Sequence, residues 1–125
     1  MKKKSKWESN LERRFQAYWM KTQIDCSIQI ERQHKFHKER QWAFDFAFQK
    51  VRVAVEIQGY GTGHTSYEGM SRDYQKHNEA LRYGWAIVYL MSNDLTRTKI
   101  RKTTNYVRTI IEERLRNKEL CRMLS

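Results

Sequence analysis

The chain has 125 residues and a mass of 15.3 kDa, the size of one domain. Lys and Arg number 25 against 14 Asp and Glu, and the formal net charge of +11 favours a polyanionic partner. Patterned aromatic residues argue against disorder, and no apolar run approaches the roughly 20 residues that span a membrane. The lysine-rich start has no apolar segment of a secretory signal behind it, and two cysteines are too few for a disulfide framework. We therefore expect a soluble intracellular domain.

The first predicted elements are a helix and a strand. Apolar residues recur at helical spacing over residues 7–21, namely Trp7, Leu11, Phe15, Tyr18 and Trp19. Ser9 and Glu12 have the spacing of a capping box near the start of this helix. Residues 24–30 alternate Ile or Cys with polar residues, which predicts a half-buried strand.

A hairpin and a loop follow. Residues 42–48 and 51–57 alternate apolar and other residues, and Gln49-Lys50 between them is a tight connection, so we expect two paired strands. Three of the five glycines lie in residues 59–64, which predicts a loop.

The second half alternates helix and strand. Residues 70–83 predict a helix that ends at Gly84, and its core face is formed by Met70, Tyr74, His77 and Leu81. Residues 85–91 form an apolar run, as expected of a strand buried on both faces. After a capping cluster at residues 92–94, a final helix carries the stripe Ile100, Val107, Ile110, Ile111 and Leu115.

The order of elements is therefore α-β-β-β-α-β-α. This order predicts a single α/β domain with a mixed β-sheet and flanking helices. No proline, repeat or linker marks an internal boundary, so we assign residues 1–6 to a basic tail and residues 7–125 to the domain.

Two carboxylates are candidates for chemistry. Asp45 interrupts an aromatic strand, where burial is costly, and Glu56 lies near the end of the next strand. Because their sequence parities differ, we expect them to share a face only if the turn or a bulge shifts the register. Converging carboxylates would form a site for a hard cation such as Mg²⁺ or Mn²⁺. In the structural alternative, Asp45 accepts hydrogen bonds from backbone or arginine groups, and Glu56 only lies at the end of an exposed strand face.

An ordered set of motifs runs through about half the chain, from Phe36 to Leu95. The set comprises FHKERQWAFDFAF from residue 36, VAVEIQG from residue 53, Gly63-His64, RDYQKHN from residue 72 and GWAIVY from residue 84. It resembles the PD-(D/E)xK nuclease superfamily, in the branch of very-short-patch-repair-like and small phage or bacterial endonuclease-domain proteins. The resemblance implies a restriction-endonuclease-like core, in agreement with the predicted order.

The resemblance also implies a metal site. Asp45 would be the motif aspartate and Glu56 the first residue of the E-x-K element, both binding Mg²⁺ or Mn²⁺, with the Ile57 carbonyl as a further ligand. A glutamate of the first helix commonly completes such sites, and Glu12 is favoured over Glu8. The metal would polarise the scissile phosphate and generate the attacking hydroxide.

The motif departs from the family at position 58, where Gln58 replaces the lysine; glutamine can hydrogen-bond the attacking water but carries no charge. Lys76 on the following helix is a candidate for the missing charge, and its alternative is a surface lysine paired with Asp73. His64 matches the histidine of this branch and would orient water or contact phosphate; its alternative is a loop histidine bonded to backbone.

Other histidines carry weaker signals. His34 and His37 lack Cys or Glu partners at zinc spacing, so we interpret them as structural or DNA-facing. A rival ββα-metal nuclease, prompted by His64 and His77-Asn78, lacks the required hairpin before its helix.

These observations predict a Mg²⁺-dependent DNA endonuclease that is selective for branched DNA, such as a Holliday-junction resolvase. Cleavage of a symmetric junction implies a homodimer, and the resemblance implies the cytoplasm of a bacterial or phage-infected cell. The alternatives are a mismatch- or duplex-nicking enzyme, a non-catalytic nucleic-acid-binding module, and action on RNA. Residues expected to bind the nucleic-acid backbone are Lys2, Lys3, Lys4, Lys6, Arg97, Lys99, Arg101 and Lys102.

Overall fold

The computed structural model describes residues 6–22, 28–58 and 67–124. Its elements are α1 (Lys6–Thr22), β1 (Glu31–Lys35), β2 (Ala43–Phe48), β3 (Val53–Gln58), α2 (Tyr67–Arg82), β4 (Ala86–Met91), the 3₁₀ turn η2 (Ser92–Leu95) and α3 (Ile100–Leu124). The predicted α/β class and the α-β-β-β-α-β-α order are confirmed. Within the described ranges, no helix combines the length and hydrophobicity needed to cross a bilayer.

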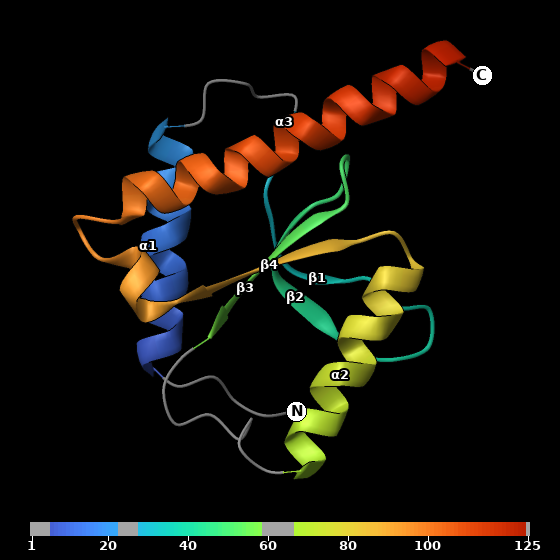
Figure 1. Ribbon diagram of the computed structural model, residues 1–125. Coiled ribbons are helices and arrows are strands. Elements are labelled where there is room, and N and C mark those ends of the chain that lie inside the picture. The colour runs from blue at the N-terminus through green and yellow to red at the C-terminus, as the bar shows by residue number, and fades with distance from the viewer. Residues whose placement is uncertain (1–5, 23–27, 59–66, 125) are drawn as a thin grey trace.

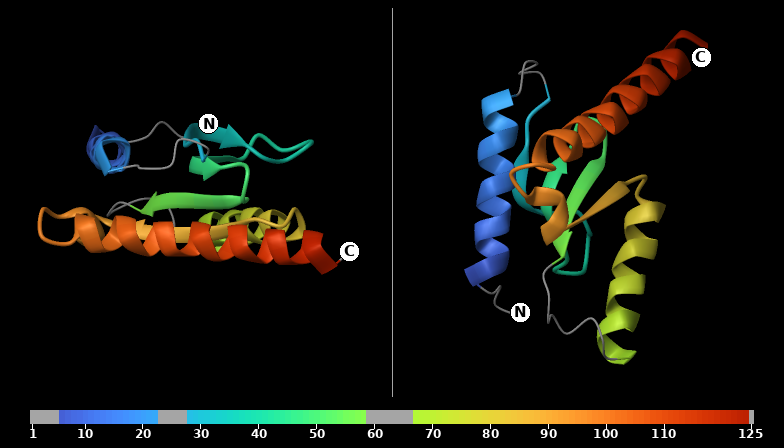
Figure 2. Two further views of the ribbon diagram at one scale, coloured as in Figure 1. Left: turned by 90° about the horizontal axis from the view of Figure 1, so that it is seen from above. Right: turned by 60° about the vertical axis from the view of Figure 1, so that its left-hand side comes forward.

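The four strands form one sheet in the order β1-β2-β3-β4. The pairs β1–β2 and β2–β3 are antiparallel, and β3–β4 is parallel. Helices α1 and α3 cover one face, and α2 covers the other (Figures 1 and 2). The sheet is therefore the middle layer between two unequal helical layers.

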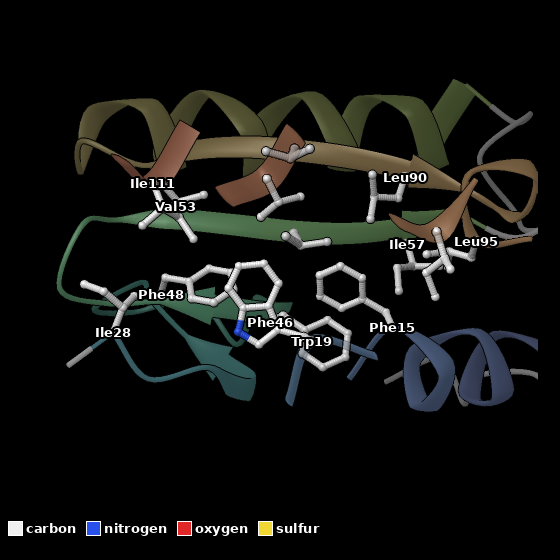
Figure 3. Close-up of a cluster of buried hydrophobic side chains, with 14 of the residues drawn as sticks. Phe15, Trp19, Ile28, Phe46, Phe48, Val53, Ile57, Leu90, Leu95 and Ile111 are labelled. Carbon is white, nitrogen blue, oxygen red and sulfur yellow. The ribbon is translucent and has the colours of Figure 1, made fainter. Parts of the chain in front are cut away.

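The larger core lies between the sheet and the α1/α3 layer. Phe15 and Trp19 of α1 pack on Phe46 and Phe48 of β2, with ring centroids 5.1 and 4.8 Å apart (Figure 3). The predicted stripe of α3 is confirmed, since Ile100, Val107 and Ile111 are buried and Ile110 and Leu115 pack at the margin of this core. Apolar residues from both helices therefore fix this face of the sheet.

The strand predicted at residues 24–30 is wrong in the part that can be described. Residues 28–30 are not extended in the sheet, and residues 24–27 lie outside the described ranges. Ile28 is buried and Ile30 packs against the core, so their apolar character reflects core contacts of a connecting segment. The strand is β1, which lies at the sheet edge and has mostly exposed side chains, so it shows no apolar alternation.

The predicted core face of α2 points outward instead. Met70, Tyr74 and Leu81 are 40%, 61% and 67% exposed, and His77 is also exposed. The buried face contains Ala80, which packs in a second cluster with Ala47 of β2 and Ala54 of β3. Small side chains on both sides let α2 approach the sheet closely.

Two further expectations concern the end of α2 and the burial of β4. The stop at Gly84 is confirmed: Gly84 has φ +83°, its N–H donates to the carbonyl of Leu81, and the N–H of Trp85 donates to that of Ala80. The expectation that β4 is buried on both faces is wrong, because β4 is an edge strand. Val88 and Leu90 face the main core, whereas Tyr89 and Met91 are exposed.

Introducing leucine at a buried and at an exposed position of α2 tests which face of this helix points toward the sheet. We expect Ala80→Leu to lower the free energy of unfolding by about 1–3 kcal/mol, because Ala80 has no exposed surface and no room for added methylenes. Gln75→Leu, at an exposed position of the same helix, should change it by about 0.5 kcal/mol or less. Urea denaturation of both variants measures the difference; equal effects would contradict this orientation of α2.

Candidate active site

Asp45 and Glu56 lie opposite each other across β2 and β3. The register pairs Phe46 with Val55 and Ala47 with Ala54, and one further step brings Asp45 opposite Glu56. The connection between the strands is a turn over residues 49–52 rather than the two residues expected. In this register the opposed residues have different sequence parity and share a face, so the expectation that a difference in parity separates Asp45 from Glu56 was wrong.

β2 is irregular at Asp45. The β1–β2 register steps from Arg32↔Phe46 to His34↔Phe44, and the intervening Gln33 has φ +50°. Phe44 packs in the α2-side cluster, although its parity matches that of Phe46 in the main core. The strand thus changes its facing at Asp45, which directs this carboxylate toward β3.

Each carboxylate accepts a hydrogen bond from the backbone of the opposite strand. The N–H of Ile57 donates to Oδ2 of Asp45 at 2.8 Å, and the N–H of Asp45 donates to Oε2 of Glu56 at 3.2 Å. Asp45 is 8% exposed and Glu56 is 7% exposed. The two carboxylates are therefore buried and held in fixed orientations.

Lys76 of α2 completes this cluster. Its ammonium donates to Oε1 of Glu56 and, at 2.8 Å, to the carbonyl of Ala43 at the start of β2. It also lies 5.7 Å from the ring centroid of Phe44. The structure thus places Lys76 against the candidate catalytic carboxylates, with only a fifth of its side chain exposed.

The electrostatics of Glu56 reflect its surroundings. Burial and the negative charge of Asp45 raise its pKa to about 7, and the opposing effect of the Lys76 ammonium does not fully compensate. A carboxyl group so placed is close to half-protonated near neutral pH. A second cation at this position would favour its ionised form.

Tyr89 of β4 was missed by the sequence reasoning. The parallel register pairs it with Glu56, and its hydroxyl lies 3.1 Å from Nδ1 of His77 on α2. Burial, the charge of Glu56 and the charge of Asp73 raise the pKa of this phenol. The position of Tyr89 beside Glu56 follows from the β3–β4 register and could not be predicted from the apolar run that contains it.

The cluster lies toward the carboxyl ends of β3 and β4. The chain leaves β3 toward α2 on one face and leaves β4 toward η2 and α3 on the other (Figure 1). Adjacent parallel strands whose connections diverge in this way create a crevice where α/β proteins bind ligands. The topology and the carboxylates therefore indicate the same place.

Glu12 takes a different position from the one predicted. It is 2% exposed and its Oε1 accepts a hydrogen bond from Nε2 of Gln33 at 3.1 Å. The helix begins at Lys6, so Ser9 and Glu12 do not cap its start. Within the described part of the chain, no three His, Cys, Asp or Glu side chains are grouped to hold one metal ion, so the Glu12–Asp45–Glu56 set is not assembled.

The other predicted residues are dispersed. Gln58 is the half-buried last residue of β3, one position beyond Ile57. His37 accepts hydrogen bonds from the backbone N–H groups of Glu39 and Arg40, a structural role. His64, Lys2, Lys3 and Lys4 lie outside the described residues, and the remaining predicted backbone-binding residues are exposed: Lys6, Arg97, Lys99, Arg101 and Lys102.

Comparisons with known proteins returned no match: no family model, curated protein or solved structure is significantly similar to this chain.

The raised pKa of Glu56 predicts a pH-dependent effect of Glu56→Gln. Unfolding lowers the pKa from about 7 toward its ordinary value of 4.5, so the folded state binds more protons between these values and wild-type stability falls as pH rises through them. Glutamine removes this titration while Asp45 and Lys76 remain. We expect the melting temperature of Glu56→Gln, relative to wild type, to increase from pH 5 to pH 8.

Glu112→Gln, on the exposed face of α3, is the matched control and should show a flat difference. A difference for Glu56→Gln that is equally flat would contradict a Glu56 buried beside Asp45.

Proposed function

We propose that this chain is a Mg²⁺- or Mn²⁺-dependent endonuclease that hydrolyses DNA phosphodiester bonds. The observation that carries the proposal is that Asp45, near the amino end of β2, and Glu56, near the carboxyl end of β3, lie side by side with the Lys76 ammonium on Glu56. Paired carboxylates beside one amine form the acid–acid–lysine combination of the nuclease resemblance, with the lysine supplied by α2 in place of position 58.

The donor set fits a divalent cation held by two carboxylates. Asp45 and Glu56 present oxygen ligands from adjacent strands, and a divalent cation would favour the ionised form of Glu56, whose pKa is raised by burial and by the charge of Asp45. A divalent ion held there would polarise the scissile phosphate and lower the pKa of the attacking water.

The residues of the chain have separate roles in this proposal. Asp45 and Glu56 hold the metal, and the Lys76 ammonium offsets the negative charge that develops on the phosphate. Gln58 hydrogen-bonds the attacking water from the end of β3. His64 contributes as the resemblance implies.

The distribution of basic residues supports a DNA substrate that the protein recognises by its shape. Arg97, Lys99, Arg101 and Lys102 are exposed around the start of α3, and such residues contact phosphates without reading base sequence. We therefore propose branched or distorted DNA as the substrate.

One observation favours a second candidate, a nucleic-acid-binding module without catalysis. Gln58 leaves the E-x-K position without its lysine, and the Lys76 ammonium is already engaged by Glu56 and the Ala43 carbonyl. In this alternative the cluster stabilises the fold.

Cleavage assays separate these functions. With Mg²⁺ or Mn²⁺ we expect symmetric cuts in a labelled four-way junction, little cutting of plain or mismatched duplex of the same sequence, and none with EDTA. Asp45→Asn should reduce the rate by about 100-fold or more, and Lys76→Gln by about 10-fold or more, because each removes charge from the reacting centre. Glu112→Gln, with the same loss of one carboxylate, should cleave as wild type.

Retained cleavage in Asp45→Asn would overturn the assignment of the site. Nicks at mismatches would keep the site and change the substrate. Tight binding without cleavage in either metal would establish the binding module.

We further propose a homodimer, because a symmetric junction cut needs two active sites. The exposed stripe of Met70, Tyr74 and Leu81 on α2 supports a second copy as its partner. If two α2 helices pack antiparallel about an axis between residues 75 and 76, Met70 meets the partner's Leu81. This pairing would cover the exposed apolar side chains of α2 in both copies.

Sedimentation equilibrium tests this surface. We expect wild type to be dimeric at micromolar concentration, and the double variant Tyr74→Lys with Leu81→Lys to be monomeric, because four like charges would face one another across the axis. Leu120→Lys, at an exposed apolar position of α3, should remain dimeric. A wild-type monomer would contradict the dimer, and a dimeric double variant would contradict this interface.

A further inference from the structure

A second candidate binding site lies on the opposite side of the sheet from α2. It is a groove of about 520 Å³ between α1, η2 and the start of α3. The lining residues are Arg14, Ala17, Tyr18 and Lys21 of α1, with Leu95, Arg97 and Ile100 from the second half of the chain. The fold thus joins two basic segments that are about 80 residues apart in the sequence.

The groove combines an apolar floor with a cationic rim. Leu95 and Ile100 are buried and Tyr18 is half-buried, whereas Arg14, Lys21 and Arg97 are exposed. Among the described residues that line it, three are cations and none is a carboxylate. Its chemistry therefore suits an anion that also carries a flat apolar surface.

One contact fixes the walls. Nη1 of Arg14 donates to the carbonyl of Leu95 at 3.2 Å, which holds α1 against η2. Below this contact, Phe15 and Leu95 belong to the main core, which further restrains both walls. The groove is therefore formed before any ligand arrives.

The groove adjoins the same end of the sheet as the carboxylates. η2 begins at Ser92, directly after β4 ends at Met91, and Glu56 and Tyr89 lie two positions before the ends of their strands. Glu56 contacts Lys76 of α2, whereas the groove is lined by α1, η2 and the start of α3. α2 lies on the opposite face of the sheet from α1 and α3 (Figures 1 and 2). The carboxylates and the groove thus lie near the same end of β3 and β4, on opposite faces of the sheet.

We infer that this groove binds a single-stranded segment of nucleic acid that flanks the scissile bond. Arg14, Lys21 and Arg97 neutralise its phosphates, and a base contacts the Tyr18 ring. Single-strand sites elsewhere pair a positive groove with aromatic side chains, whereas a duplex keeps its base faces stacked and would leave the apolar floor unused. The inference rests on the proposed function, because it assigns a path to the substrate strand.

Fluorescence anisotropy with labelled oligonucleotides tests the groove separately from catalysis. EDTA is present throughout, and the probes are a DNA single strand, the RNA of the same sequence and the DNA duplex of the same length. We expect Lys21→Gln with Arg97→Gln to weaken single-strand binding about 10-fold or more and to reduce the salt slope by about 1.4, as for two lost phosphate contacts. Tyr18→Leu should weaken single-strand binding about 10-fold and leave duplex binding within about 2-fold.

The control is Lys38→Gln with Arg116→Gln, which removes the same charge from exposed positions outside the groove. It should change single-strand binding by less than about 3-fold. An equal loss in the groove and control variants would overturn the inference, as would a Tyr18→Leu loss that is as large for duplex.

The remaining outcomes separate this inference from the function. If the groove variants bind as wild type while Asp45→Asn abolishes cleavage, the groove is overturned and the nuclease stands. If the unaltered chain binds neither single strand, the groove is overturned, and the junction cleavage assay decides the nuclease separately. Tighter binding of the RNA than of the DNA strand would keep the groove and overturn DNA as the substrate.

Discussion

The organisation of this protein depends on two carboxylates buried face to face between β2 and β3. Asp45 and Glu56 would repel each other and lose their hydration if they were merely enclosed. The backbone N–H groups of Ile57 and Asp45 and the ammonium of Lys76 replace that hydration. Each of these partners requires a particular feature of the fold: a set register, an irregular β2, and a helix close to the sheet.

The requirement for Lys76 explains the orientation of α2. With Lys76 and Ala80 against the sheet, Met70, Tyr74 and Leu81 lie about a third of a turn away around the helix and are exposed. Ala47 and Ala54 on the sheet leave space for close packing. The inner face of α2 thus carries the ion pair of Lys76 with Glu56, and its large apolar residues depart from the usual preference for burial.

The sequence predicted the elements whose burial follows a simple period. The stripe of α3, the alternation in β2 and β3, and the glycine stop of α2 each report a local constraint, and the order of the elements followed from them. The sequence could not predict features that depend on how one element pairs with another. β1 is an exposed edge strand without apolar alternation, and the hairpin register depends on a turn over residues 49–52 that the sequence made look shorter.

The same distinction applies to the site. Residue type and the nuclease resemblance indicated Asp45, Glu56 and Lys76, because charged residues in or beside apolar segments are conspicuous in a sequence. Tyr89 is inconspicuous in an apolar strand and becomes part of the site only through its pairing with Glu56. Glu12 was predicted from the resemblance alone, and in the structure it accepts a hydrogen bond from Gln33 of β1.

The burial that makes the cluster costly also determines which ligand stabilises it. Burial and the charge of Asp45 raise the pKa of Glu56 to about 7 despite the Lys76 ammonium. Two ionised carboxylates and one ammonium carry a single net negative charge, so a divalent ion held there would leave a net positive charge that favours an anionic ligand. In the proposed function, a phosphate would then bring the cluster close to neutrality and would contact the Lys76 ammonium. The charge of the cluster would thus couple the binding of a divalent ion to the binding of phosphate at one end of the sheet.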